Sequence, residues 1–222
     1  MLIYSLEVLA VTEHNAVTHI VTLGDSLTEG YGIEKENAYP AIVEKKLLDK
    51  GYKIKIFNAG ISGSTTASAP SRLKWLLKSQ PHIVFIALGA NDGLRGITIE
   101  TTKQNLKNTI QIAKKANMKV WLAGMKLPPN YGEAYTSKFE TMFQEIAKEE
   151  NIPLLPFLLE GVAGQVTLNQ PDGIHPNEKG HQMMADVIFS FFQQELNRIE
   201  SMNHSTDSVD SINHSIKSSV KN

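Results

Sequence analysis

The sequence of 222 residues contains no cysteine, and its 22 lysine and arginine residues nearly balance its 23 aspartate and glutamate residues. Without cysteine, the chain can form no disulfide, thiolate nucleophile or thiolate metal site, although this absence suits reducing and oxidising compartments alike. A formal net charge of −1, without any basic run, argues against nucleic acid or a membrane surface as partner. No apolar run approaches the ~18 residues that span a bilayer, so we expect no integral membrane association.

The two ends of the chain differ in composition from its middle. Residues 1–10 are mildly apolar, but they lack a basic start and include Glu7, which makes a poor signal peptide. We therefore expect residues 1–17 to be a lead-in to the first strand and the chain, as it stands, to be cytoplasmic, unless its start is misplaced. Residues 199–222 are rich in serine and asparagine, which predicts a disordered polar tail. Residues 18–198 are of a length that suits one domain.

Strand-like and helix-like segments alternate through residues 18–198. Short apolar runs predict strands, and apolar residues three or four apart predict helices. The expected strands are residues 19–23, 53–57, 82–88, 119–123 and 152–157, and the expected helices are about 38–50, 66–79, 100–117, 132–149 and 177–198. This alternation predicts a parallel sheet with helices on both faces, an α/β fold of three layers. Trp75 and Trp121 are expected in the core.

The first expected strand leads into Gly-Asp-Ser-Leu-Thr at residues 24–28, which presents Ser26 at a strand-to-helix turn. Ligands of parallel sheets bind beyond the carboxyl ends of the strands, so this serine is a candidate nucleophile. Alone, the motif also fits a helix cap or a phosphate cradle. Position 28 is threonine, which departs from the Gly-x-Ser-x-Gly elbow of α/β-hydrolases, and no Gly-x-x-x-x-Gly-Lys-Ser/Thr motif supports nucleotide binding.

A second motif, Asp-Gly-Ile-His-Pro at residues 172–176, supplies an imidazole and a carboxylate. Asp172 precedes His175 by three residues, close enough to orient its ring within one turn. Pro-Asp-Gly at residues 171–173 is also a strong turn signal by itself, and the turn can be what presents both side chains. A hydroxyl, an imidazole and an orienting anion are the three groups of an activated serine nucleophile.

The second and third strands end in segments that offer hydrogen-bond donors. Residues 58–65 form a glycine- and serine-rich stretch that includes Gly63, and residues 89–93 include Asn91. The N–H groups of Ser26 and Gly63 and the side-chain amide of Asn91 would form an oxyanion hole. Asp25 and Asp92 are also candidates for a functional pair of carboxylates, but we expect them to fix backbone turns near the site.

Four blocks in this order, with Ser26, Gly63, Asn91 and the pair Asp172 and His175, resemble the GDSL or SGNH hydrolases over about residues 18–197. The resemblance implies a flavodoxin-like α/β/α sandwich with a five-stranded parallel sheet. Ser64 departs from the aspartate that many relatives carry at this position. Further stretches resemble the bacterial arylesterases, lysophospholipases and acyl-CoA thioesterase I, many of which are exported to the periplasm or secreted. In that subgroup the segment that corresponds to Leu94–Ile97 is a mobile loop at the acyl site. The resemblance therefore implies substrate-binding residues in this loop, Leu94, Arg95, Gly96 and Ile97, and in the matching stretch at residues 126–132, Pro128 and Tyr131.

The resemblance implies a serine esterase that hydrolyses acyl esters or thioesters through an acyl-enzyme, without a metal or an organic cofactor. Its partner would be a small-molecule substrate, and the protein would be a monomer or a weak dimer. Two alternatives stay open: a carbohydrate O-deacetylase on the same scaffold, and a non-catalytic binding module. The loops at residues 94–97 and 126–132 favour acyl chains, and the presence of every catalytic residue argues against a binding module.

Overall fold

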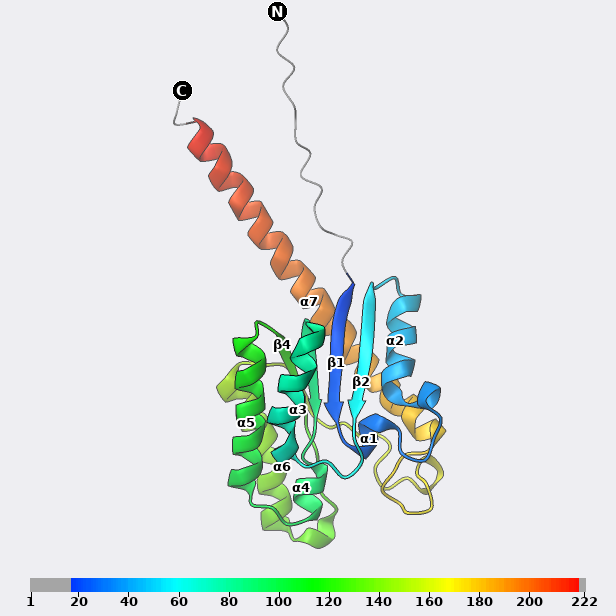
Figure 1. Ribbon diagram of the computed structural model, residues 1–222. Coiled ribbons are helices and arrows are strands. Elements are labelled where there is room, and N and C mark those ends of the chain that lie inside the picture. The colour runs from blue at the N-terminus through cyan, green and yellow to red at the C-terminus, as the bar shows by residue number, and fades with distance from the viewer. Residues whose placement is uncertain (1–16, 220–222) are drawn as a thin grey trace, which may run out of the picture.

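The computed structural model describes residues 17–219, with side chains up to residue 202, and it confirms the α/β fold. Five parallel strands form one sheet in the order β2-β1-β3-β4-β5, and Figure 1 shows β2 beside β1. The strands are β1 (Thr18–Gly24), β2 (Ile54–Gly60), β3 (Ile83–Ala87), β4 (Lys119–Ala123) and β5 (Leu154–Leu155). The expected lead-in at residues 1–17 lies outside the described residues, apart from Val17. Each of the five strands overlaps its expected range, and the bounds differ by at most a few residues.

The helices cover both faces of the sheet, as right-handed crossovers between parallel strands require. They are α1 (Ser26–Glu29), α2 (Tyr39–Asp49), α3 (Ala69–Leu76), α4 (Ala90–Leu94), α5 (Ile99–Lys115), α6 (Glu133–Glu150) and α7 (Glu178–Ser219). Helix α2 packs against α7 on one face, and α5 packs between α3 and α6 on the other. Short 3₁₀ turns connect them at Lys35–Asn37, Thr66–Ser68, Leu77–Ser79, Pro129–Tyr131 and Val166–Leu168.

The strand register aligns the carboxyl ends of the three central strands. Gly24, the last residue of β1, pairs with Gly60 of β2 on one side and with Ala87 of β3 on the other. The segments that follow these three residues therefore leave the sheet at the same edge. This edge receives Ser26, Gly63 and Asn91, although they lie far apart in the sequence.

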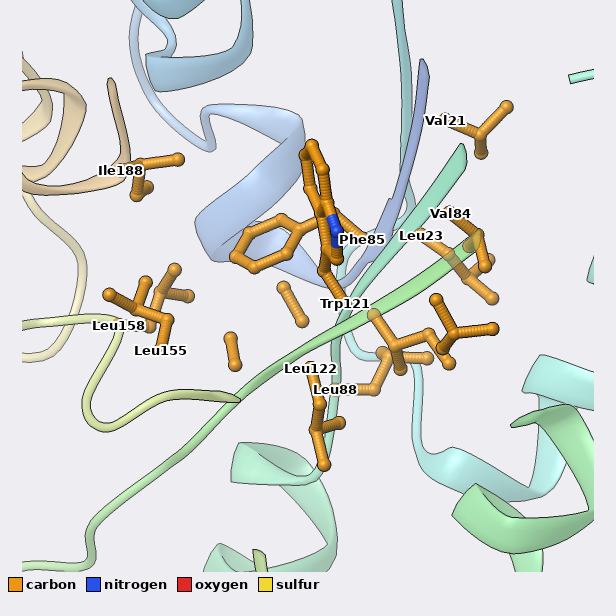
Figure 2. Close-up of a cluster of buried hydrophobic side chains, with 14 of the residues drawn as sticks. Val21, Leu23, Val84, Phe85, Leu88, Trp121, Leu122, Leu155, Leu158 and Ile188 are labelled. Carbon is orange, nitrogen blue, oxygen red and sulfur yellow. The ribbon is translucent and has the colours of Figure 1, made fainter. Parts of the chain in front are cut away.

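The core lies on both sides of the central strands, where every residue of β3 is buried. Figure 2 shows Phe85 and Trp121 close together, and the Trp121 ring also packs on Phe192 of α7 at a centroid distance of 4.7 Å. The expectation that Trp75 is a core residue is wrong, because its side chain is 67% exposed. At 100° per residue, Trp75 lies on the side of α3 opposite to the buried Leu73.

Helix α7 continues past residue 198, the expected end of the domain. The structure is helical up to Ser219 and so differs from the expected disordered tail (Figure 1). No glycine or proline follows Gly180 to end the helix. The domain limits themselves stay a prediction. Within residues 17–219, no helix combines the length and the apolar character that crossing a membrane requires.

Candidate active site

Ser26 is the first residue of α1, directly after the turn that ends β1. The turn is tight, since a Cβ added to Gly24 would come within 1.9 Å of Thr28 Oγ1. Asp25, rather than Ser26, caps the helix, because its Oδ1 accepts a hydrogen bond from the Leu27 N–H at 3.1 Å. The Ser26 hydroxyl is therefore not needed as a cap, and its Oγ lies 3.0 Å from His175 Nε2.

The turn at residues 171–173 presents Asp172 and His175, so both interpretations of that motif hold together. Asp172 Oδ1 accepts hydrogen bonds from the Ile174 and His175 N–H groups, each at 3.0 Å. Its Oδ2 lies 2.8 Å from His175 Nδ1. One carboxylate thus fixes the backbone of the turn and the orientation of the imidazole ring.

The hydrogen bonds at Asp172 decide which nitrogen of His175 carries the proton. The hydrogen bond from the His175 ring, followed by those from the two backbone N–H groups, lowers the pKa of Asp172 from 3.8 to about 2. At neutral pH this carboxylate is ionised and can only accept, so His175 Nδ1 donates to it. His175 Nε2 is then left to accept from the Ser26 hydroxyl.

Gln170 joins the two turns that carry the nucleophile and the imidazole. Its side-chain amide donates to the carbonyl oxygens of Tyr31 at 2.6 Å and Pro176 at 3.1 Å. Its backbone N–H donates to the His175 carbonyl at 2.7 Å. The Tyr31 ring packs on the His175 ring at a centroid distance of 4.6 Å. These contacts hold the imidazole against the end of α1.

The three residues expected to supply oxyanion donors, Ser26, Gly63 and Asn91, line one cavity together with His175. Gly63 has a φ of +75°, a left-handed backbone conformation that favours glycine, and its carbonyl accepts from Arg95 Nη2 at 3.0 Å. Asn91 Nδ2 donates to Asp25 Oδ2 at 3.3 Å and to the Ser64 carbonyl at 3.1 Å. Ser64, where the sequence departs from many relatives, therefore still contributes a backbone acceptor.

Asp25 and Asp92 fix turns near the site, as expected. Asp92 is fully buried and accepts hydrogen bonds from the N–H and hydroxyl of Thr66, which ties α4 to the segment after β2. Asp25 is 1% exposed. Burial raises the pKa of Asp25 to about 6, against the opposing effect of hydrogen bonds from Leu27 and Asn91.

The cavity has a volume of about 690 Å³ and a largely apolar lining. Its apolar wall comes from four loops and helix ends and comprises Leu27, Leu94, Leu127, Pro128, Pro129, Phe157, Leu159, Ala163 and Ile174. The wall starts at Ser26 and His175, so an apolar group held there would lie beside the nucleophile. A volume in this range suits a small-molecule ligand.

Of the six residues expected to bind substrate, the structure places Leu94 and Pro128 in the cavity lining. The other four are not among the residues that line the cavity. Tyr131 donates its hydroxyl hydrogen to the Leu94 carbonyl at 3.2 Å, Arg95 contacts Gly63 as described, and Gly96 and Ile97 continue the same loop. Tyr135 in α6 supports this loop through a 2.9 Å hydrogen bond to the Ile97 carbonyl.

Sequence reasoning missed the part of the apolar wall that Phe157, Leu159 and Ala163 form. This part of the wall belongs to the loop after β5, which Asn169 stabilises through 2.8 Å hydrogen bonds to the carbonyls of Val162 and Gln165. No sequence pattern within this loop predicts that these three side chains line the cavity. Among the described residues, no group of three or more His, Asp or Glu side chains could hold a metal ion.

The sequence and the fold of this chain are similar to those of known proteins. Residues 22–183 match the sequence profile of the GDSL-like lipase/acylhydrolase family. The chain is 40% identical to esterase TesA of Pseudomonas aeruginosa, over 77% of this chain and 86% of that protein. It is 39% identical to thioesterase 1/protease 1/lysophospholipase L1 of Escherichia coli K12, over 82% and 86%. The crystal structure of the psychrotrophic esterase EstA from Pseudoalteromonas superposes with a TM-score of 0.78 at 34% identity, covering 81% and 99% of the two chains.

Proposed function

The chain belongs to the GDSL-like lipase/acylhydrolase family, and from that premise we propose that it is a serine esterase that hydrolyses acyl esters or thioesters through an acyl-enzyme. The observation that carries the proposal is the continuous set of hydrogen bonds from Ser26 through His175 to Asp172, at 3.0 and 2.8 Å. The set opens into an apolar cavity large enough for an acyl chain.

In the acylation step, Ser26 Oγ attacks the acyl carbonyl carbon while His175 Nε2 takes the hydroxyl proton. The ionised Asp172 stabilises the imidazolium that forms and keeps its ring in place. The carbonyl oxygen becomes an oxyanion, for which the N–H groups of Ser26 and Gly63 and the Asn91 amide are the proposed donors; one such donor typically contributes about 3 kcal/mol. His175 then protonates the departing alcohol or thiol.

In the deacylation step, His175 takes a proton from a water molecule that attacks the acyl group on Ser26 Oγ. The same donors hold the second oxyanion, and its collapse releases the acid and returns the proton to Ser26. Every proton transfer uses the one imidazole, so none of these steps needs another titratable side chain.

The apolar wall supports an acyl chain rather than an acetyl group on a sugar as the substrate. Leu94, Leu127 and Phe157 would bury methylene groups, each contributing about 0.8 kcal/mol. A sugar would instead need polar side chains to pair with its hydroxyl groups. The substrate is therefore proposed to be a small molecule with an acyl chain of several carbons.

The site is complete within one chain, since Ser26, Asp172, His175 and the proposed donors all come from it. Such a site needs no residue from a partner chain, and we propose that the protein is a monomer or a weak dimer. Light scattering across a range of protein concentrations, with activity per chain measured in parallel, tests this: activity should not depend on concentration.

Hydrolysis of p-nitrophenyl esters from acetyl to palmitoyl, by the wild type and by Ser26→Ala, tests the proposed function. We expect turnover that requires Ser26 and that is faster for medium chains than for acetate. Turnover confined to acetate would favour deacetylation, and the absence of turnover would favour a binding module. Full activity in Ser26→Ala would contradict the mechanism.

A further inference from the structure

Asp25 is a buried carboxyl group that the steps above do not use. It lies directly before Ser26, lines the cavity and is 1% exposed. Burying a carboxyl group costs free energy unless hydrogen bonds compensate for the lost hydration, and burial indeed raises its pKa to about 6. The hydrogen bonds that the Asp25 carboxyl group accepts therefore indicate its role.

The two oxygens of the Asp25 carboxyl serve two different elements. Oδ1 accepts from the Leu27 N–H at 3.1 Å and caps α1, which carries the nucleophile. Oδ2 accepts from Asn91 Nδ2 at 3.3 Å, and Asn91 belongs to α4, 66 residues away in the sequence. One side chain thus connects the helix of Ser26 with the side-chain amide proposed for the oxyanion hole.

The surroundings of the Asn91 amide determine which of its two ends faces Asp25 and Ser64. Asp25 Oδ2 and the Ser64 carbonyl both lie beside one end of the amide, and an ionised carboxylate and a carbonyl only accept hydrogen bonds. That end must be the NH2 group. If the amide rotated by 180°, its oxygen would face these two acceptors, and it would also repel an oxyanion that forms at Ser26.

We propose that Asp25 is a positioning residue for the oxyanion hole: its carboxyl group holds the Asn91 amide with Nδ2 toward Ser26, ready to donate to the oxyanion. The inference rests on the proposed function. The hydrogen bond at 3.3 Å is long, so its hydrogen can be shared with the oxyanion as charge develops. Because this contact matters only when the oxyanion exists, Asp25 acts on kcat and not on KM.

A double-mutant cycle on a medium-chain p-nitrophenyl ester tests the inference. Asp25→Ser keeps a good helix cap but is too short to reach Asn91, and Asn91→Ala removes the amide. We expect Asp25→Ser to lower kcat by about tenfold or more, with KM within about twofold of the wild type. Since Asp25 acts through Asn91, Asp25→Ser in the Asn91→Ala background should cause no further loss.

Asn58→Ala is a matched control for a structural effect on α1. Asn58 Nδ2 donates to the Thr28 carbonyl at 2.8 Å, so it supports the same helix without contacting Asn91. Any loss from Asn58→Ala should multiply with the loss from Asn91→Ala, as independent effects do. Circular dichroism on each variant verifies that the fold is retained.

The outcomes separate the inference from the proposed function. An unchanged kcat in Asp25→Ser, or a loss that multiplies with that of Asn91→Ala, would overturn the positioning role. A wild-type kcat in Asn91→Ala would also overturn it, because Asp25 would then have no oxyanion donor to position. The first two results leave the esterase proposal intact, and the third removes only Asn91 from its oxyanion hole. The esterase proposal itself fails only if Ser26→Ala retains activity or the wild type has none.

Discussion

Replacing Asp25 by asparagine is expected to stabilise the protein in neutral and alkaline solution but not in acid. Burial raises the pKa of Asp25 from 3.8 to about 6. Between these two pH values the folded protein keeps a proton that the unfolded chain has released. The contribution of Asp25 to the free energy of unfolding therefore decreases as the pH rises through this range.

The size of the effect follows from the pKa difference and from one lost hydrogen bond. A rise of about two units corresponds to about 3 kcal/mol against the folded state at pH 8. The variant's asparagine can still accept from the Leu27 N–H, but its amide hydrogens would face those of Asn91, which costs about 1 kcal/mol. The net gain at pH 8 is therefore about 2 kcal/mol, whereas at about pH 4 the lost hydrogen bond outweighs the gain.

Urea unfolding at pH 4 and pH 8, followed by the fluorescence of the buried Trp121, measures both values. The charged and titratable groups near Asp25, which include Arg72, His175 and Tyr39, are the same in the two proteins. Comparing wild type and variant at each pH therefore isolates Asp25. A change in the free energy of unfolding that is equal at the two pH values would refute the reasoning.

Four further outcomes are expected. His181 is buried, its Nδ1 accepts from the Tyr39 N–H, and burial lowers its pKa to about 4, so its contribution to the free energy of unfolding should fall by up to about 3 kcal/mol as the pH falls from 6.5 to about 4. The difference in stability between the wild type and His181→Gln, measured by urea unfolding at the two pH values, should change by this amount. Asp172→Ala should lower kcat by about 10³-fold or more in steady-state assays, because His175 loses its orientation. Ala163→Phe should shorten the preferred acyl chain in an ester series while p-nitrophenyl acetate is still hydrolysed, because it fills the cavity wall. Trp75→Ser should change the free energy of unfolding by less than about 0.5 kcal/mol, whereas Trp121→Ala should lower it by about 3–5 kcal/mol in thermal or urea unfolding.

Much of the fold could be predicted from the sequence, because the strands are buried on both faces and the helices are amphipathic. The β3 run and the Leu106, Ile110 and Ala113 face of α5 are examples in which the pattern follows directly from burial. The expectation for Trp75 is wrong because it assigns this residue to an apolar helix face, whereas its position on α3 faces away from the buried Leu73. The length of α7 was also not predicted, since its polar composition past residue 199 indicated disorder.

The site could be predicted where it depends on strand ends and local turns. Ser26, Gly63 and Asn91 follow three aligned strands, and Asp172 and His175 share one turn, so their meeting at one edge follows from topology. Phe157, Leu159 and Ala163 could not be assigned, because their place in the cavity depends on how the loop after β5 folds against the other loops. The contact between Asp25 and Asn91 is likewise tertiary.

Mass spectrometry of the protein during turnover of a medium-chain p-nitrophenyl ester tests the central claim most directly. The account predicts that rapid acid quenching traps a mass increase of one acyl group on the peptide that contains Ser26, and that Ser26→Ala shows neither this increase nor turnover. An acyl group on a different residue, or continued turnover by Ser26→Ala, would contradict the account.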